Sequence, residues 1–250
     1  MTGALEAAFD ERLAEVTAYL DFLDELETAV LTGAPRFVDS SKAVSPGQTQ
    51  ILRAGVFIQL YNLVEATMTR CMDAMATASS DGRWKAAQLN EKFRREWVKV
   101  VAASNVEMNA ERRLSYAVAL TEILVRADPL AEFRLDKGGG GNWDDKVIEQ
   151  MLERVGLRLI LTPTVRVAAK RPYRDGRGPL EIVVKLRNDL AHGNISFSEC
   201  GQNETAPGLR ELTDKTSMYL RTVVRAVERY IDRFEFLHPQ SRPAEEGEAA

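Results

Sequence analysis

The chain has 250 residues, of which 45% are hydrophobic and 28% are charged, and its formal net charge is −4. This composition is typical of a soluble globular protein. The slightly acidic balance argues against broad coating by nucleic acid but leaves room for a local basic cleft. No apolar run approaches the roughly 20 residues of a membrane-spanning helix, and no signal peptide is evident. Cys71 and Cys200 lie far apart without metal-ligand spacing, so we expect ordinary thiols and a cytoplasmic location.

Helical periodicity dominates the first third of the chain. From Leu5 to Leu31, apolar residues recur at helical intervals with acidic residues between them, and a glycine and a proline follow. We expect this acidic helix to pack on the body of the protein or on a second subunit, with a free partner-binding helix as the alternative. After a polar linker, Ser45-Pro46-Gly47-Gln48 predicts a capping box. The helix that it opens runs to about Ala78 and is apolar on most sides, so it should be central.

Glu65 is a charged residue inside this otherwise apolar helix. A carboxylate in such a place either lies on a solvated strip beside Arg70 or pairs with a cation from another element. Arg187 is the candidate cation, and the pairing would steer its guanidinium. Both interpretations remain open at the level of the sequence.

Shorter helices separated by turns are predicted for the middle of the chain. Residues 84–101 have helical apolar spacing and mixed charge, and Asn109 would cap a further helix that ends near Arg126. Four glycines follow at 138–141. Because no Lys-Ser or Lys-Thr comes after them, they indicate a flexible hinge and not a phosphate-binding loop.

The segment after the glycines is predicted to form a short helix and then an extended piece. Asn142 would cap the helix, which runs from Trp143 to Val155. Residues 157–167 alternate enough to form a short strand or extended segment, and Pro163 would confine it to an edge.

The most basic run in the chain is Lys170-Arg171-Pro172-Tyr173-Arg174-Asp175-Gly176-Arg177. It directly precedes another predicted helix. The cations Lys170, Arg171, Arg174 and Arg177 could bind RNA phosphates, and Tyr173 could stack on a base. A solvated surface loop is the alternative interpretation of the same run.

The helix after the basic run ends in Lys185-Leu186-Arg187-Asn188-Asp189-Leu190-Ala191-His192-Gly193-Asn194. The two leucines belong to its core stripe, and the glycine is placed to end the helix in the left-handed conformation. Asn188 and His192 are four residues apart and share a face, which the long side chain of Arg187 can reach. The sequence therefore predicts a cation, an amide and an imidazole presented together at the end of a helix.

Such a group of side chains suits the cleavage of a phosphodiester. RNA supplies its own nucleophile, the 2′-hydroxyl, so a protein has only to move protons and neutralise charge on the phosphate. His192 can do the first because imidazole titrates near neutral pH, and Arg187 can do the second with its planar fork of donors. We expect no metal and no cofactor. The alternative is that both residues merely complement the negative end of the helix dipole.

The segment from Arg187 to Gly193 resembles the signature of the HEPN superfamily of small all-α domains. That signature is an arginine and a histidine separated by four to six residues, with a polar residue after the arginine and a glycine after the histidine. The wider layout, with an early apolar helix from Arg53 to Met75 that contains Glu65, resembles the MAE-type branch of HEPN-like nucleases. The resemblance covers Ser45 to Arg233, and the motif is its specific part.

The resemblance implies a metal-independent endoribonuclease. Members of the superfamily dimerise so that two motifs line one cleft, and they recur as toxins and in anti-phage defence. Carried over to this chain, Arg187 and His192 would be catalytic and Asn188 supporting, with RNA as the substrate. We further expect Asp189 and Glu65 to be supporting residues. Some HEPN toxins carry a tyrosine two residues after the histidine, where a partner enzyme adds nucleotides. Asn194 stands at that position here, which puts silencing by this route in doubt.

Two other functions stay open. The protein could be a non-catalytic binding or regulatory module in which Arg187 and His192 hold a nucleotide or a partner protein. It could also be the effector half of a defence pair, with its acidic first helix and tail bound by a neutralising partner. A metal-dependent nuclease is not favoured, because no histidines and carboxylates occur at ligand spacing.

We expect the whole chain to form an all-α, HEPN-like bundle with an added N-terminal helix. A long helix from Leu209 to Leu237 would pack antiparallel to the motif helix. We divide the chain into an N-terminal helix and linker (1–44), a helical domain (45–238) with a hinge at 136–142, and a disordered tail (239–250). The tail has almost nothing to bury.

Overall fold

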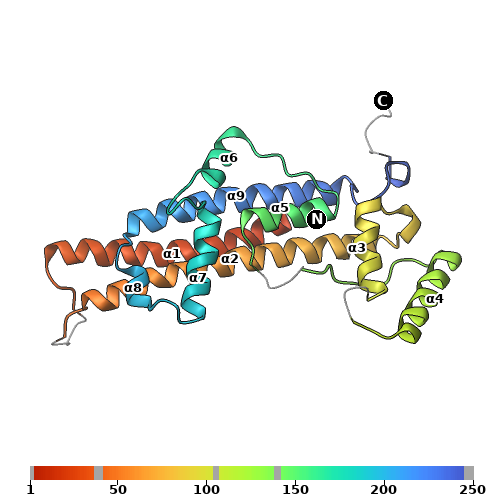
Figure 1. Cartoon of the computed structure of the whole chain (residues 1–250). Helices are drawn as coiled ribbons and strands as arrows, with labels where there is room; N and C mark the ends of the chain where they lie inside the picture. The colour runs from red at the N-terminus through yellow and green to blue at the C-terminus, as the bar shows by residue number, and fades with distance from the viewer. Residues whose placement is uncertain (1–2, 37–41, 104–106, 138–141, 245–250) are drawn as a thin grey trace, which may run out of the picture.

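The structure, a computed structural model, describes residues 3–36, 42–103, 107–137 and 142–244. Over these residues the protein is an elongated bundle of α-helices, and pairing between extended segments is limited to isolated bridges. Three long helices lie side by side along the molecule: α1 (Ala4–Thr32), α2 (Pro46–Asp81) and α9 (Ala206–Asp232) (Figure 1). The all-α bundle that the sequence predicts is confirmed.

Shorter helices cover the sides and one end of this bundle. Figure 1 shows α7 lying across the long helices, and α3 and α4 gathered at one end of the molecule. The shorter helices are η1 (Ala86–Gln88), α3 (Glu91–Val101), α4 (Ala110–Arg126), α5 (Asp145–Arg154), α6 (Pro163–Lys170), α7 (Pro179–Ala191), α8 (Phe197–Gly201) and η3 (Pro239–Ser241).

α2 is the centre of the bundle. Its capping box is present as predicted: the hydroxyl of Ser45 accepts the N–H of Gln48 at 3.3 Å, and the Gln48 side chain accepts the N–H of Ser45 at 2.8 Å. The helix is buried on most sides. It therefore holds the helices that pack on it, among them α1, α7 and α9, in defined positions. Its fully enclosed side chains include Ala54, Val56, Phe57, Leu60, Tyr61, Val64 and Met68.

α1 and α9 run antiparallel, and each caps the start of the other with a carboxylate. Glu228, near the end of α9, accepts three backbone N–H groups at the start of α1 at distances between 3.0 and 3.2 Å. Glu27, near the end of α1, accepts the N–H of Ala206 at 3.1 and 3.2 Å. Carboxylates satisfy the unpaired N–H groups of a helix start and complement its positive end. These contacts fasten the acidic helix to the body of the protein, one of the two positions expected for it.

The short strand or extended segment predicted at residues 157–167 forms no strand: residues 157–162 have no regular secondary structure, and a helix begins inside the segment. α6 starts at Pro163, and the side chain of Thr162 accepts the N–H of Val165 at 3.3 Å. Proline at the first helical position loses no hydrogen bond, and its fixed backbone angle suits a helix. Pro163 is therefore a start signal here and not an interruption.

Three further predictions need correction. Asn142 does not cap a helix, because α5 begins at Asp145 and its N-cap is Asp144. The helix expected at residues 84–101 begins later, at the N-cap Asn90, with η1 before it. α7 crosses the long helices and is not antiparallel to α9 (Figure 1). Crossing lets one face of α7 pack on α2, α6 and α9 together.

The division of the chain stays a prediction. Residues 138–141 of the predicted hinge (136–142) and residues 245–250 of the predicted tail (239–250) lie outside the described residues, while the described start of the tail contains η3. Within the described part, α1 packs on both α2 and α9. Of the helices in that part, none is long and apolar enough to cross a membrane.

Candidate active site at the end of α7

α7 is held by its apolar face and ends where the sequence predicts. Val183, Leu186 and Leu190 are buried in the core. Gly193 has φ +71°, in the left-handed region, and its N–H donates to the carbonyl of Leu190 at 3.3 Å. The N–H of Asn194 donates to the carbonyl of Asp189 at 2.8 Å. This pair of bonds is a Schellman motif, which ends the helix at a defined residue and fixes the backbone that carries the motif.

The side chain of Arg187 is held between two elements. Its Cζ atom lies 4.0 Å from the centre of the Tyr61 ring, which belongs to α2. Its Nη1 donates to the Oδ1 of Asn188 at 2.8 Å. The Nδ2 of Asn188 in turn donates to the Oδ1 of Asn142 at 3.0 Å. A single chain of contacts therefore links α2, the end of α7 and the segment before α5 through one guanidinium.

Tyr61 supports this cation from inside the core. The residue is fully buried, and burial raises the pKa of its hydroxyl, while the charge of Arg187 lowers it in part. The face of an aromatic ring attracts a cation, most strongly where water is excluded. Arg187 is itself only half-buried, so part of its fork of donors remains accessible for an anion.

His192 occupies the C-cap position, and its side chain is exposed. Its backbone N–H donates to the carbonyl of Asn188 at 2.9 Å. Five residues along a helix correspond to a rotation of about 140° relative to the starting residue, so Arg187 and His192 diverge, one toward α2 and one toward solvent. Among the residues that the structure describes, no hydrogen bond joins their side chains.

Asp189 and Glu65, the other predicted supporting residues, make different contacts. Asp189 pairs with Lys185 one turn earlier, and the Lys185 ammonium holds the pKa of this carboxyl below its usual range. Glu65 is half-buried, and its charge raises the pKa of Tyr61. Within the described ranges Glu65 forms no ion pair with Arg187. The pairing that would have steered the guanidinium is replaced by the ring of Tyr61.

Two cations of the predicted RNA-binding run already form ion pairs with carboxylates of this chain. Lys170 pairs with Asp145 and with Glu149, and Arg174 pairs with Glu204. These carboxylates neutralise part of the positive field of the run.

The aromatic residue of this run, Tyr173, also makes contacts within the protein. Its hydroxyl donates to the carbonyl of Gly208 at 2.9 Å, and the Nζ of Lys215 lies 5.0 Å from its ring centre. Arg171 and Arg177 are exposed. The whole run lies at the start of α7, whose 13 residues span roughly 20 Å, while the motif lies at its other end (Figure 1).

No metal centre is apparent in the described part of the chain. The described residues contain no group of three or more His, Cys, Asp or Glu side chains that could together hold a metal ion.

A family model described as HEPN_MAE_28990-like HEPN matches residues 1–236, which is nearly the whole chain. The chain belongs to this HEPN family. Membership suggests an RNA-related or nuclease-like module. No curated protein and no solved structure matches the chain. The matched range extends from α1 to α9, so it includes both the motif helix and the N-terminal helix of this HEPN protein.

Two residues that contact the candidate site, Tyr61 and Asn142, could not be identified from the sequence. Tyr61 is one of many large apolar side chains in α2, and no local pattern connects it with α7. Asn142 carries a signal for a helix cap, which the structure assigns to Asp144 instead. No local sequence pattern indicates either residue, because their contacts with α7 join residues far apart in the chain.

Proposed function

We propose that this HEPN protein is a metal-independent endoribonuclease in which Arg187 binds the scissile phosphate and His192 transfers protons. The observation that carries the proposal is the fixed guanidinium of Arg187, held by Tyr61 and Asn188 at the helix end that also bears an exposed histidine. Catalysis by positioning and by preorganised charge requires such a support.

The reaction needs only groups of the kind found here. The 2′-hydroxyl of one nucleotide attacks the adjacent phosphorus, and the bond from phosphorus to the 5′-oxygen of the next nucleotide breaks. The products carry a 2′,3′-cyclic phosphate and a 5′-hydroxyl. One imidazole takes the proton of the 2′-hydroxyl, and a second group protonates the leaving 5′-oxygen. The guanidinium neutralises the charge that builds on the phosphate oxygens.

A homodimer would supply both proton-transfer groups. Within one chain Arg187 points toward α2 and His192 toward solvent, so one copy offers a single imidazole, turned away from its own cation. Two copies with the ends of their α7 helices facing each other would offer two imidazoles and two guanidinium groups in one cleft. The exposed Arg171 and Arg177 would then contact RNA away from the cut, at the other end of α7.

The test is cleavage of total RNA in excess chelator by the wild type and by the His192→Ala and Arg187→Ala variants. His238→Ala is the matched control, since His238 is the second of the two histidines and is exposed. The proposal expects cleavage by the wild type and by the His238→Ala variant, and loss of cleavage in the other two. Cleavage by the His192→Ala variant at the wild-type rate would exclude the assigned role.

A non-catalytic binding module is the second candidate. It is favoured by one observation: in the described part of the chain no hydrogen bond joins the side chains of Arg187 and His192, which diverge from the helix. In that case the two residues would hold a nucleotide or a partner protein separately. Saturable ligand binding that is lost in the Arg187→Ala variant, with no RNA cleavage by the wild type, would support this candidate. A role as a toxin or anti-phage effector with a neutralising partner is compatible with the enzyme.

A further inference from the structure

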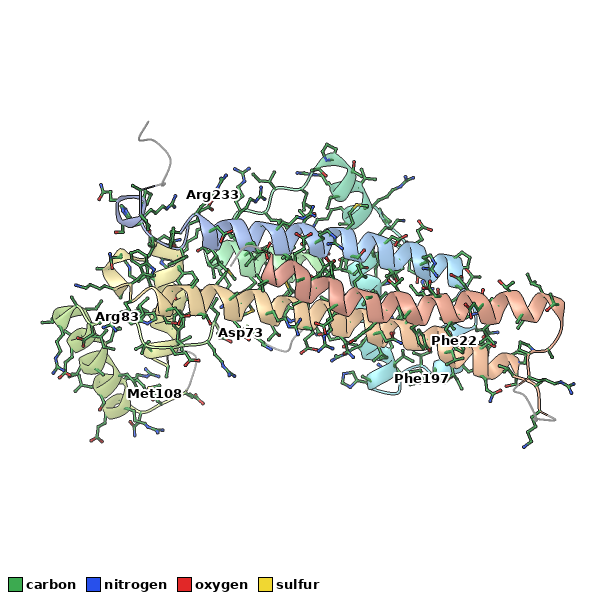
Figure 2. All side chains as sticks on the ribbon, turned by 180° about the vertical axis from the view of Figure 1, so that it is seen from behind. Phe22, Asp73, Arg83, Met108, Phe197 and Arg233 are labelled. Carbon is green, nitrogen blue, oxygen red and sulfur yellow. The ribbon has the colours of Figure 1, made fainter. Side chains whose placement is uncertain are left out.

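Phe197 is an exposed aromatic residue that follows the motif closely in the chain. It is exposed by 40% and is the first residue of α8, five positions beyond His192. Figure 1 shows α8 beside the end of α7, and Figure 2 shows Phe197 at the lower edge of the molecule. Single exposed apolar residues are common on protein surfaces. What distinguishes Phe197 is therefore its place beside the motif and the way its backbone is held.

The path from His192 to this ring is short and open. Five residues span at most about 18 Å when the chain is fully extended. Residues 192–195 form turns and bends, which shorten that path. The exposed residues between His192 and Phe197 are Gly193, Asn194 and Ser196. An RNA strand that presents a phosphate at the end of α7 would therefore pass close to the ring of Phe197.

α8 is anchored on α2, which gives the ring a defined position. The two helices approach so closely that a Cβ atom added to Gly201 would collide with the carbonyl oxygen of Gln50. The hydroxyl of Ser198 donates to the Oε1 of the same Gln50 at 2.5 Å. Cys200 and Gly201 are buried in this contact region, whereas Phe197, at the start of the helix, is not.

A capping box fixes the backbone of Phe197 itself. The hydroxyl of Ser196 accepts the N–H of Glu199 at 3.2 Å, and the carboxylate of Glu199 accepts the N–H of Ser196 at 2.9 Å. The same carboxylate accepts the Ser196 hydroxyl at 2.7 Å. These bonds surround Phe197 in the sequence and define where α8 begins. The ring is thus carried by an ordered helix start and not by a free loop.

α2 supports both this ring and the cation of the motif. Gln50 lies under α8 and Tyr61 lies under Arg187, and the two are eleven residues apart on α2. Eleven residues correspond to roughly 16 Å along a helix. One rigid helix therefore sets the separation between the guanidinium and the aromatic ring. A separation of this size corresponds to a few nucleotides of an RNA strand.

We propose that Phe197 is a base-stacking residue, which binds an unpaired base of the RNA within a few nucleotides of the scissile phosphate. Every base has an aromatic face, and a ring on a fixed backbone binds it with little loss of conformational entropy. Tyr173, the aromatic that the sequence suggests for this role, lies at the other end of α7 and makes contacts within the protein.

This role rests on the proposed ribonuclease function and deepens it, because it names single-stranded RNA as the substrate. Bases inside a duplex are stacked on their neighbours and offer no free face to a side chain. Unpaired bases in loops and single strands can be stacked on aromatic side chains. Duplex RNA is therefore a poor substrate for this site.

Binding of an RNA that cannot be cleaved tests the contact without requiring activity. The probe is a fluorescent, unstructured single strand in which fluorine replaces every 2′-hydroxyl, so the nucleophile is absent. Anisotropy titrations compare the wild type with the Phe197→Leu and Phe197→Trp variants. The control is Tyr116→Leu, which removes an aromatic exposed by 38% on α4, at the far end of the molecule (Figure 1). Phe197→Leu should bind about tenfold more weakly, while Phe197→Trp and the control should bind like the wild type.

A strand of abasic spacers with the same length and charge provides the matched change on the RNA side. It has phosphates but no base to stack, so the wild type and the Phe197→Leu variant should bind it equally. If Phe197→Leu weakened binding of both strands by the same factor, the ring would be acting through the fold and not on a base. That result would overturn the role, as would wild-type affinity of Phe197→Leu for the strand that carries bases.

Cleavage assays separate this role from the ribonuclease activity itself. At low concentrations of single-stranded RNA, kcat/KM of Phe197→Leu should fall about tenfold, mainly through KM, and duplex RNA of the same sequence should be cut poorly by the wild type. Unchanged kcat/KM in Phe197→Leu would overturn the stacking role and leave the ribonuclease function standing. Binding that depends on Phe197 without any cleavage by the wild type would do the reverse. No RNA binding by the wild type would contradict both.

Discussion

The Cζ atom of Arg187 lies 4.0 Å from the centre of the Tyr61 ring, so the cation of the HEPN motif rests on a residue of the central helix. Tyr61 is fully buried among the apolar side chains of α2. A guanidinium placed on such a support has little freedom to move. The position of the motif is thus determined by the core of the bundle as well as by α7.

Replacing Tyr61 separates the role of the ring from that of the hydroxyl. The Tyr61→Phe variant keeps the ring, and we expect it to cleave RNA at close to the wild-type rate. The Tyr61→Leu variant loses the cation–π contact, which is worth about 1 to 2 kcal/mol in a desolvated site, so the rate should fall about tenfold. Single-turnover cleavage measures both, and thermal unfolding of each variant shows how much of the loss is due to stability. Equal rates in the two variants would mean that the ring does not support Arg187.

Asn142 should act as a positioning residue through Asn188. The Asn142→Ala variant removes the oxygen that accepts from Asn188, and a lost hydrogen bond of about 1 kcal/mol corresponds to a severalfold lower kcat. The Asn142→Asp variant retains an acceptor and should recover most of the rate. Steady-state kinetics should show the change in kcat with little change in KM. Asn203→Ala, at an exposed asparagine between α8 and α9, is the matched control. A loss of the same size in the control would remove the assigned role.

The carboxylate of Glu228 should contribute to stability, because three N–H groups at the start of α1 depend on it. In the Glu228→Ala variant these groups lose their acceptor, and we expect the free energy of unfolding to fall by about 1 to 3 kcal/mol. Glu211→Ala, on the same helix, removes only an exposed ion pair with Lys215 and should change it by about 0.5 kcal/mol or less. Urea unfolding measures both. Equal effects would show that the reciprocal capping of α1 and α9 contributes little.

Neither cysteine should react in the folded protein. Burial raises the pKa of Cys71 from 9.0 to about 12 and that of Cys200 from 9.0 to about 11. Both thiols stay neutral in the folded state at pH 8, and only a thiolate attacks a disulfide reagent. A thiol titration should find no reactive group in buffer and two per chain in denaturant.

The same two pKa values predict how stability depends on pH. Unfolded thiols ionise near pH 9.0, while the folded ones do so only near 11 and 12. The stabilising contribution of the two thiols is therefore complete below pH 9 and is lost as the pH rises through about 11 for Cys200 and about 12 for Cys71. In the Cys71→Ala variant the loss of stability over this window should be smaller. Rapid reaction of Cys71 in buffer would contradict its assigned burial.

The parts of the fold that depend on neighbouring residues could be predicted from the sequence. Ser45 and Gln48 form their capping box, and Gly193 ends α7, because in each case the bonding partners lie within a few positions. Pro163 is the exception among these local signals. A proline can either interrupt a strand or begin a helix. Here the capping side chain of Thr162, the preceding residue, is the signal that a helix begins.

The contacts that position the candidate site could not be predicted in the same way. Asn142 and Asn188 are 46 residues apart, and Tyr61 is farther still from Arg187. Their meeting depends on how α7 crosses the long helices, which no local pattern specifies. The basic run shows the same limit. Its composition indicates a basic patch whose cations are unpaired, whereas Arg174 forms an ion pair with Glu204, a residue distant in the sequence.

The most direct test of the central claim is the identity of the RNA ends made in excess chelator. The wild type and the His192→Ala variant are incubated with a short RNA, and the new 3′ ends are analysed by mass spectrometry. The account predicts 2′,3′-cyclic phosphate ends from the wild type and intact RNA from the His192→Ala variant. Ends with a 3′-hydroxyl, or cyclic phosphate ends made equally well without His192, would contradict it.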